Sequence, residues 1–137
     1  MKLPYVKIPS ADPRKPWIIR PIIPVIISSQ QKSVRIDALI DSGADRCFFH
    51  YELGRRLGLE VEKGHLGYVS GIEGLRSPVW IHNIRLQIVG SDEQILVEAG
   101  FTKSAGIFAI LGQEGFFDAY RIKFERDRGI IEIVPIK

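Results

Sequence analysis

The feature that most constrains the fold of this chain is a short alternating segment at residues 33–40. Val34, Ile36 and Ala38 are apolar, and two of the positions between them are charged. A period of two is typical of a strand that is buried on one face and reaches water on the other. The segment therefore predicts a half-buried strand, and with it a protein built from sheet.

A single carboxylate follows this strand at once, in the turn Asp41-Ser42-Gly43-Ala44. Ser42 can hydrogen-bond to nearby carboxylate or backbone groups, Gly43 lets backbone approach closely, and Ala44 keeps the next position small. These residue types favour a buried carboxylate held by backbone, so Asp41 is a candidate catalytic acid. The residues alone leave open an ordinary turn in which Asp41 only accepts backbone N–H groups.

The rest of the chain is also rich in strand patterns. Further strands are predicted at residues 24–28, 66–70, 76–89 and 94–99, and a C-terminal hairpin at 122–124 and 130–134. Phe49, Leu53 and Leu57 are spaced as on one face of a helix, which predicts a short helix ending near Gly58.

Two further motifs follow Asp41 in the sequence. Residues 68–75 lie between extended segments, and Gly71 and Gly74 flank a two-residue tip, Ile72-Glu73, which suits a hairpin turn. The second motif is the apolar run Ala109-Ile110-Leu111 with Gly112 after it. The following residues, 113–117, predict the start of a helix.

The order and spacing of these elements over residues 22–134 resemble the single-lobe, retropepsin-like group of aspartic peptidases. The resemblance implies an all-β fold: an acid-protease single-lobe closed β-barrel with one or two short helices and a flap hairpin. It also implies that the apolar-apolar-Gly motif crosses behind the Asp41 loop. The implied activity is that of an aspartic endopeptidase acting on a polypeptide substrate, with no metal or other cofactor.

Assembly follows from the chemistry that the resemblance implies. Aspartic peptidases use two carboxylates that share a proton, and this chain carries one such loop. The second carboxylate is then Asp41 of a twofold-related copy, so we expect a homodimer with the active site on its axis. The substrate-binding residues implied by the resemblance are Ser42, Gly43, Ala44, Asp45, Gly71, Ile72, Glu73 and Gly74.

The chain departs from the family pattern at two positions. Viral members often carry an Arg after the second-motif glycine, paired with the residue that corresponds to Asp45; Gln113 stands there instead. Asp45 must then find another partner, such as Arg46 or a residue of the opposite subunit. Glu114 stands where cellular members usually have Asp.

Composition bounds the remaining possibilities. Six of the eight prolines lie in residues 1–24, so we expect an extended or irregular N-terminal arm at residues 1–21, followed by the peptidase domain at residues 22–137. The net charge of +3 comes from 19 basic and 16 acidic residues without a basic stripe, which argues against nucleic-acid binding.

The sequence also gives little support for a membrane-spanning segment or a metal site. The apolar run after Pro21 is interrupted by Pro24 and is far shorter than the roughly 20 residues of a membrane span. The single cysteine, Cys47, suits a reducing compartment and a cytoplasmic location, and its surroundings favour a small buried apolar side chain. His50, His65 and His82 lack the spacing of metal ligands.

Two alternatives to the peptidase remain. One is a noncatalytic acid-protease-fold module that dimerises or binds extended peptides by strand addition. The other is a subdomain of a larger enzyme that needs a further region to act. The first would keep the fold and the hairpin of residues 68–75 but lose the geometry of the carboxylate pair.

Overall fold

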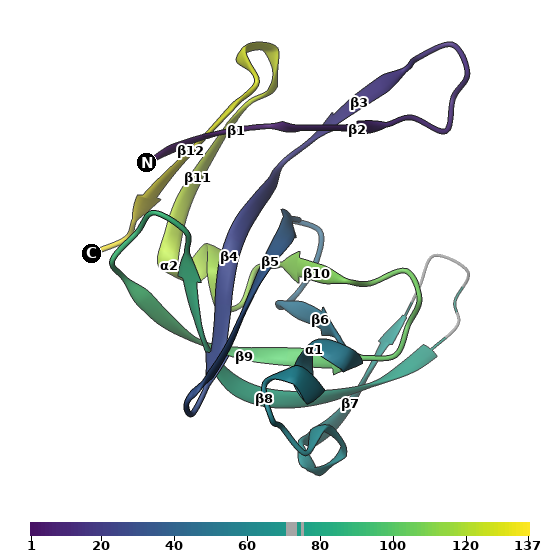
Figure 1. Ribbon diagram of the computed structural model, residues 1–137, viewed down its shortest axis with the longest axis vertical. Coiled ribbons are helices and arrows are strands. Elements are labelled where there is room, and N and C mark those ends of the chain that lie inside the picture. The colour runs from purple at the N-terminus through teal and green to yellow at the C-terminus, as the bar shows by residue number, and fades with distance from the viewer. Residues whose placement is uncertain (71–73, 75) are drawn as a thin grey trace.

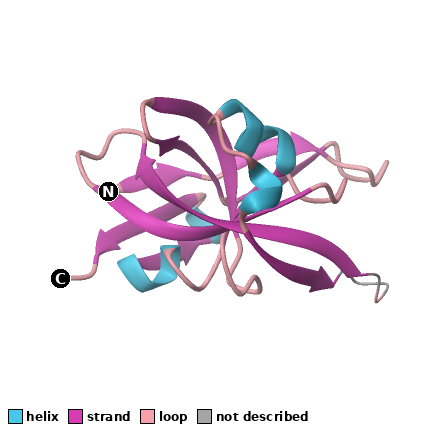
Figure 2. Cartoon of the chain, turned by 90° about the horizontal axis from the view of Figure 1, so that it is seen from below, coloured by secondary structure: helices cyan, strands magenta, loops and turns pink. Residues whose placement is uncertain are grey.

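The computed structural model describes residues 1–70, 74 and 76–137, and strands dominate it (Figures 1 and 2). The main sheet has seven strands in the order β4-β5-β10-β6-β9-β8-β7. These are β4 (Ile22–Ser29), β5 (Lys32–Ile40), β6 (Phe48–His50), β7 (His65–Ser70), β8 (Arg76–Ile88), β9 (Gln94–Thr102) and β10 (Ala109–Leu111). A further pairing of β4 with β8 closes six of the strands into a barrel, which confirms the expected all-β fold class.

Alternation along β5 produces the buried wall that the sequence predicts. Val34, Ile36, Ala38 and Ile40 are buried, whereas the side chains between them are exposed or half-buried. Strand β4 pairs antiparallel with β5, with Val25 opposite Ile36. The apolar side chains of both strands therefore face one core, and burying them is the main term that stabilises the barrel.

The helices are short and lie at the edges of the barrel: α1 (Tyr51–Arg56), α2 (Phe116–Ala119) and the 3-10 turns η1 (Val61–Lys63) and η2 (Arg126–Arg128). The helix expected from Phe49 to Leu57 begins later, because Phe49 belongs to β6 and His50 caps α1 by accepting the N–H of Glu52 at 3.1 Å. The chain leaves the helix at Gly58, whose φ of +79° suits glycine.

The later strands agree with the sequence in kind and differ in length. Strand β9 runs to Thr102, beyond the expected 94–99, because its end pairs with β6 as well as β8. The C-terminal hairpin is present as β11 (Tyr120–Glu125) and β12 (Ile130–Pro135), joined through η2 and Gly129.

The N-terminal arm is more regular than its prolines suggest. It contains β1 (Lys2–Pro4), β2 (Val6–Pro9) and β3 (Trp17–Arg20). Strand β1 pairs with β12 and so joins the sheet of the C-terminal hairpin, whereas β2 and β3 pair only with each other. Proline is compatible with such short edge strands. The domain boundary at residue 21 stays a prediction.

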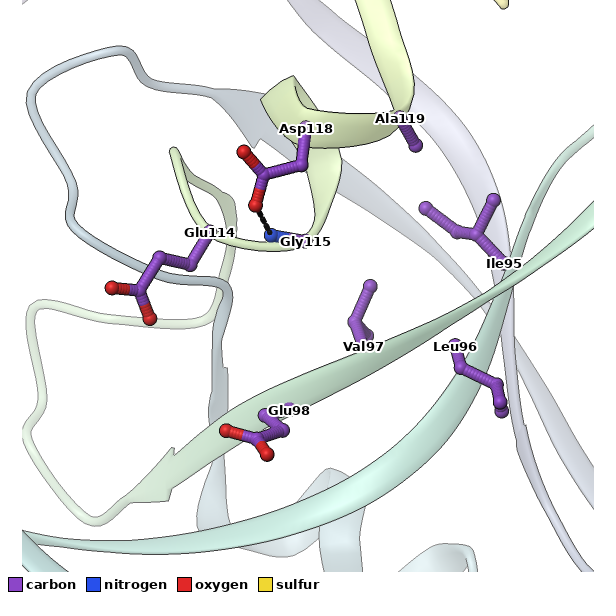
Figure 3. A pocket seen from close by; sticks show the side chains of 8 residues that line it. All are labelled: Ile95, Leu96, Val97, Glu98, Glu114, Gly115, Asp118 and Ala119. Carbon is purple, nitrogen blue, oxygen red and sulfur yellow. Dashed lines mark hydrogen bonds between the residues drawn. The ribbon is translucent and has the colours of Figure 1, made fainter. Parts of the chain in front are cut away.

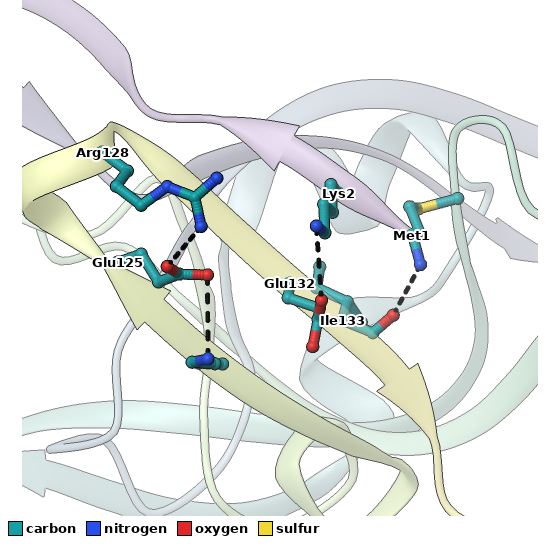
Figure 4. A network of polar contacts seen from close by, with 7 residues as sticks. Met1, Lys2, Glu125, Arg128, Glu132 and Ile133 are labelled. Carbon is teal, nitrogen blue, oxygen red and sulfur yellow. Dashed lines mark hydrogen bonds and ion pairs between the residues drawn. The ribbon is translucent and has the colours of Figure 1, made fainter.

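Polar contacts fasten β1 to β12, as Figure 4 shows. The Met1 ammonium donates to the Ile133 carbonyl at 3.1 Å, and Lys2 Nζ lies 3.9 Å from a Glu132 carboxylate oxygen. At the far end of the hairpin Arg128 donates to Glu125 at 2.9 Å. Exposed pairs of this kind contribute little free energy, so the backbone ladder is the main link.

Cys47 is fully buried, as expected, and this burial raises the pKa of its thiol. None of the helices among residues 1–70, 74 and 76–137 is long and apolar enough to cross a membrane.

The barrel core allows a test of stability. Phe49 has no exposed surface and its ring lies 5.9 Å from that of Phe101, centroid to centroid. We expect Phe49→Ala to lower the free energy of unfolding by about 3–5 kcal/mol, because it leaves a cavity in the core. The matched control is Phe108→Ala, at a side chain that is 58% exposed. Urea unfolding of both variants makes the comparison, and equal losses would contradict this description of the core.

Candidate active site

Asp41 is the first residue after β5, and backbone groups hold it on two sides. Its N–H donates to the Leu111 carbonyl at 2.9 Å, and its own carbonyl accepts from Ala44 N at 3.2 Å. One carboxylate oxygen, Oδ1, accepts the N–H of Gly43 at 2.9 Å. The side chain is half-buried, so the carboxylate is fixed in place while remaining reachable from one side.

Strand β10 supports this turn from behind. It runs parallel to β5, with Leu111 opposite Ile40, and antiparallel to β6. This arrangement confirms the expectation that the second motif passes behind the Asp41 loop. At Gly112 a Cβ atom would lie 2.2 Å from the Arg46 carbonyl oxygen and 2.7 Å from that of Ala44. Only glycine fits between these backbone segments.

The residues after Gly112 bind the loop directly. Gln113 donates its backbone N–H to the Ala44 carbonyl at 2.8 Å and its side-chain amide to the Ser42 carbonyl at 2.7 Å. The backbone N–H of Glu114 donates to the Asp45 carbonyl at 2.8 Å. The sequence showed Gln113 only as a departure from the family pattern. Its amide in fact ties the loop to the end of β10.

Asp45 does not pair with Arg46. The Arg46 guanidinium lies 4.0 Å from the Glu114 carboxylate instead, and within the described residues Asp45 forms no ion pair. Its side chain is exposed. The expected partner of Asp45 is therefore absent from the described part of its own chain.

Asp41 lies in an open groove of about 780 Å³. Five of the eight sequence-predicted substrate-binding residues are among the described residues, and three of them, Gly43, Ala44 and Asp45, line the groove. Ser42 is exposed beside it. The remaining walls come from β6, β7, β8, β10 and the residues that lead into β6 and β10. They are Arg46, Phe48, Gly67, Tyr68, Val69, Ser70, Val79, Ile81, Ile107 and Ile110.

The sequence analysis placed Tyr68, Val69 and Ser70 in the hairpin and Ile110 in the second motif, but assigned none of them to the wall of a groove. It named Arg46 only as a possible partner of Asp45. Ile107 looks like an ordinary apolar position, and only the fold brings it to the groove.

Residues of β7 and β8 form one rim of the groove. Strands β7 and β8 pair antiparallel up to Ser70 opposite Arg76, and Tyr68 and Val69 line the groove. Gly71, Ile72 and Glu73 lie outside the described residues. Gly74 is described: it is exposed, and its φ of +76° suits a glycine in a turn.

Trp80 lies in an aromatic cluster apart from the residues that line the groove. Its ring stands edge-on to that of Tyr51, at 6.1 Å between centroids, and Lys103 Nζ lies 4.5 Å from the centroid of the Tyr51 ring. The Tyr51 hydroxyl donates to Glu62 at 2.8 Å; this bond raises the pKa of Tyr51 and lowers that of Glu62.

A second pocket, of about 460 Å³, lies between β9 and α2 (Figure 3). Glu98 and Glu114 line it, together with Asp118, which accepts the N–H of Gly115 at 3.1 Å. Leu96 beside it is 78% exposed. Across the part of the chain that the structure describes, no group of His, Cys, Asp or Glu side chains has the arrangement of a metal site.

Comparison with known proteins gives a result for the fold alone. No protein-family model matches the sequence, and no curated protein matches it at a significant level. Among solved structures the chain is similar to the EIAV protease complexed with the inhibitor HBY-793, with a TM-score of 0.52 and 20% sequence identity. The match covers 68% of this chain and 81% of that protease chain. The chain thus has the single-lobe acid-protease fold of retropepsins.

The close approach at Gly112 can be tested by adding one methyl group. We expect Gly112→Ala to lower the free energy of unfolding by about 1–3 kcal/mol or more, because the methyl group meets backbone carbonyls that cannot rotate away. Gly106→Ala is the matched control, since nothing lies within 4 Å of a Cβ at that position. Thermal and urea unfolding measure both changes. A Gly112→Ala protein as stable as its control would contradict the described packing behind the loop.

Proposed function

We propose that this chain is an aspartic endopeptidase that hydrolyses peptide bonds as a homodimer. The observation that carries the proposal is the Asp41 carboxylate, anchored by Gly43 N–H and presented in an open groove of a retropepsin-like fold. The groove has a volume of about 780 Å³, within the usual range of pockets that hold a ligand. The apolar side chains of its walls can pack against side chains of the substrate, and its exposed backbone groups can hydrogen-bond to the substrate's amides.

The second carboxylate comes from the twofold-related subunit. A dyad needs two equivalent carboxylates facing each other, and one chain supplies one Asp-Ser-Gly-Ala loop. A twofold axis beside Asp41 meets this need with an isologous interface. Two carboxylates about 3 Å apart repel by on the order of 5 kcal/mol at an effective dielectric near 20, so the pair holds one proton between them.

The chemistry then divides between the two subunits. The ionised Asp41 takes a proton from a water molecule as that water attacks the scissile carbonyl, and the protonated Asp41 of the partner subunit donates its proton to the developing oxyanion. Collapse of the resulting diol breaks the C–N bond: the proton held by the first carboxylate goes to the leaving amine, and the carboxylate of the partner subunit takes back a proton from one diol hydroxyl. The Gly43 N–H, which donates to Oδ1 at 2.9 Å, holds the carboxylate in position.

The neighbouring residues position the substrate in this proposal. The Gly43 carbonyl accepts a substrate amide, with Ser42, Ala44 and Asp45 forming the adjoining floor. The hairpin that includes Gly71, Ile72, Glu73 and Gly74 covers the peptide backbone. Gln113 supports the floor by binding the Ser42 carbonyl at 2.7 Å.

The first test replaces the proposed catalytic group. Asp41→Asn keeps the shape of the side chain and removes the base, so we expect peptide cleavage to fall by about three orders of magnitude or more with the fold retained. The matched control is Asp37→Asn, at an exposed carboxylate on the same strand. Cleavage of a peptide library is the measurement, with circular dichroism to check the fold.

The result also separates the peptidase from the noncatalytic module. A wild-type protein that binds library peptides without cutting them would support the module instead. Comparable turnover by wild type and Asp41→Asn would show that another group performs the catalysis.

The second test concerns the shared site. Wild-type and Asp41→Asn subunits are mixed under exchanging conditions, and only dimers with two intact carboxylates should cut. An equal mixture should then keep about a quarter of the wild-type activity, because random pairing of a twofold dimer leaves that share of fully wild-type pairs. Activity is measured across mixing ratios beside sedimentation. A straight-line fall with the wild-type fraction would instead indicate independently active monomers.

A further inference from the structure

The β2–β3 hairpin is an isolated two-stranded sheet. Val6 pairs with Arg20 and Ile8 with Ile18, and neither strand pairs with any other described strand. Figure 1 shows the hairpin extending away from the barrel, beyond the end of β4. A two-stranded hairpin alone in water is marginally stable, so a hairpin of this kind is expected to lie against another surface.

The apolar side chains of this hairpin are also incompletely covered. None of its apolar residues is buried: Trp17 is 56% exposed and Val6 37%, while Ile8, Ile18 and Ile19 are half-buried. Apolar side chains occur on both faces, because Ile8 and Ile18 share one face and Pro9 and Trp17 share the other. Apolar side chains that stay exposed on one subunit can be covered by another surface on association.

Charge indicates what kind of surface would receive the hairpin. Residues 1–21 hold five of the 19 basic residues of the chain, at Lys2, Lys7, Arg14, Lys15 and Arg20, and one of its 16 acidic residues, Asp12. Their net charge is therefore +4, against −1 for the rest of the chain. An acidic surface with some apolar area would be complementary to the hairpin.

The base of the hairpin lies beside the proposed dimer axis. The carbonyl of Pro21, the residue after β3, accepts the N–H of Ile40 at 2.9 Å, and Ile40 precedes Asp41. If two Asp41 loops meet on a twofold axis, both hairpin bases lie close to that axis. Strands of four residues extend about 13 Å at roughly 3.3 Å per residue, so the tip of the hairpin projects about that far from its base.

A suitable surface flanks the same loop. The pocket of Figure 3 is lined by three acidic residues, Glu98, Glu114 and Asp118, next to the exposed Leu96. The Arg46 guanidinium, 4.0 Å from Glu114, offsets only one of these three negative charges. Glu114 is tied to the loop through the bond from its N–H to the Asp45 carbonyl. The acidic surface of one subunit and the basic hairpin of the other therefore both lie beside the shared axis.

We propose that the β2–β3 hairpin of each subunit docks on the partner subunit, with Lys7 and Lys15 facing the partner subunit's Glu98 and Glu114. The contact is reciprocal and adds to the interface that joins the two Asp41 loops. It rests on the proposed homodimeric peptidase, and it assigns to residues 6–20 the role of stabilising that dimer.

The first experiment shortens the hairpin. Residues 7–19 are replaced by Asn-Gly, a two-residue turn that can join the paired residues Val6 and Arg20. We expect the dimer dissociation constant, measured by sedimentation, to rise about tenfold or more, because docked apolar and charged contacts are lost. Circular dichroism checks that the barrel is intact. An unchanged dissociation constant would overturn the inference.

The second experiment uses full-length protein and tests the docking surface. Lys7→Glu with Lys15→Glu should weaken the dimer about tenfold, and Glu98→Lys with Glu114→Lys should do the same, since like charges then face each other. Combining all four changes should restore affinity. The matched control is Arg56→Glu, an exposed reversal on α1. Failure of the combined variant to recover would assign the hairpin to a different surface and overturn the proposed contact.

A spectroscopic signal reports the hairpin directly. The chain has two tryptophans, so Trp80→Phe leaves Trp17 as the sole indole. The fluorescence emission of Trp17 should shift to shorter wavelength as the protein concentration is raised and the dimer forms, because docking removes water from the indole ring. An unchanged spectrum would contradict docking.

These readouts do not depend on catalysis. A dimer that loses affinity on shortening but cuts no peptide would support the hairpin contact and overturn the proposed peptidase. If the shortened protein still cuts peptides and its dimer dissociation constant is unchanged, the peptidase is supported and the hairpin contact is overturned. A wild-type chain that stays monomeric at every concentration would overturn both.

Discussion

The structure depends on one close contact, the passage of β10 behind the Asp41 turn. Gly112 lies where a Cβ would meet the carbonyls of Arg46 and Ala44, and the groups on either side of it hold the turn. Leu111 accepts the Asp41 N–H, and Gln113 binds both Ala44 and Ser42. A segment about 70 residues away in sequence thus fixes the position of the carboxylate, and the groove forms around a rigid floor.

The parts that sequence could predict are those with local causes. The alternation at Val34, Ile36 and Ala38 is buried on one face as expected, because a strand has a period of two whatever it pairs with. The glycines of the Asp41 turn and of the second motif were also informative, since each removes a side chain from a crowded place. The role of Asp41 stays a prediction.

The parts that sequence could not predict depend on distant partners. The prolines indicated an extended or irregular arm, but not its partner: β12 supplies the ladder that makes β1 a strand. Phe49 has helical spacing to Leu53, yet pairing with Phe101 of β9 makes it part of a strand. The amide of Gln113 could not be assigned either, because its acceptor on Ser42 lies 71 residues earlier in the chain. Tertiary context decided each of these.

The pairing of β1 with β12 also affects how the chain can fold. Lys2 lies opposite Glu132, and the parallel ladder of β10 with β5 joins Ile110 to Leu39. Such contacts are distant in sequence and must await loop closure, so the ladder that includes β1 forms only after residues 130–132 have been synthesised. Until then residues 2–4 have no partner strand, and their unpaired edge is open to pairing with another molecule.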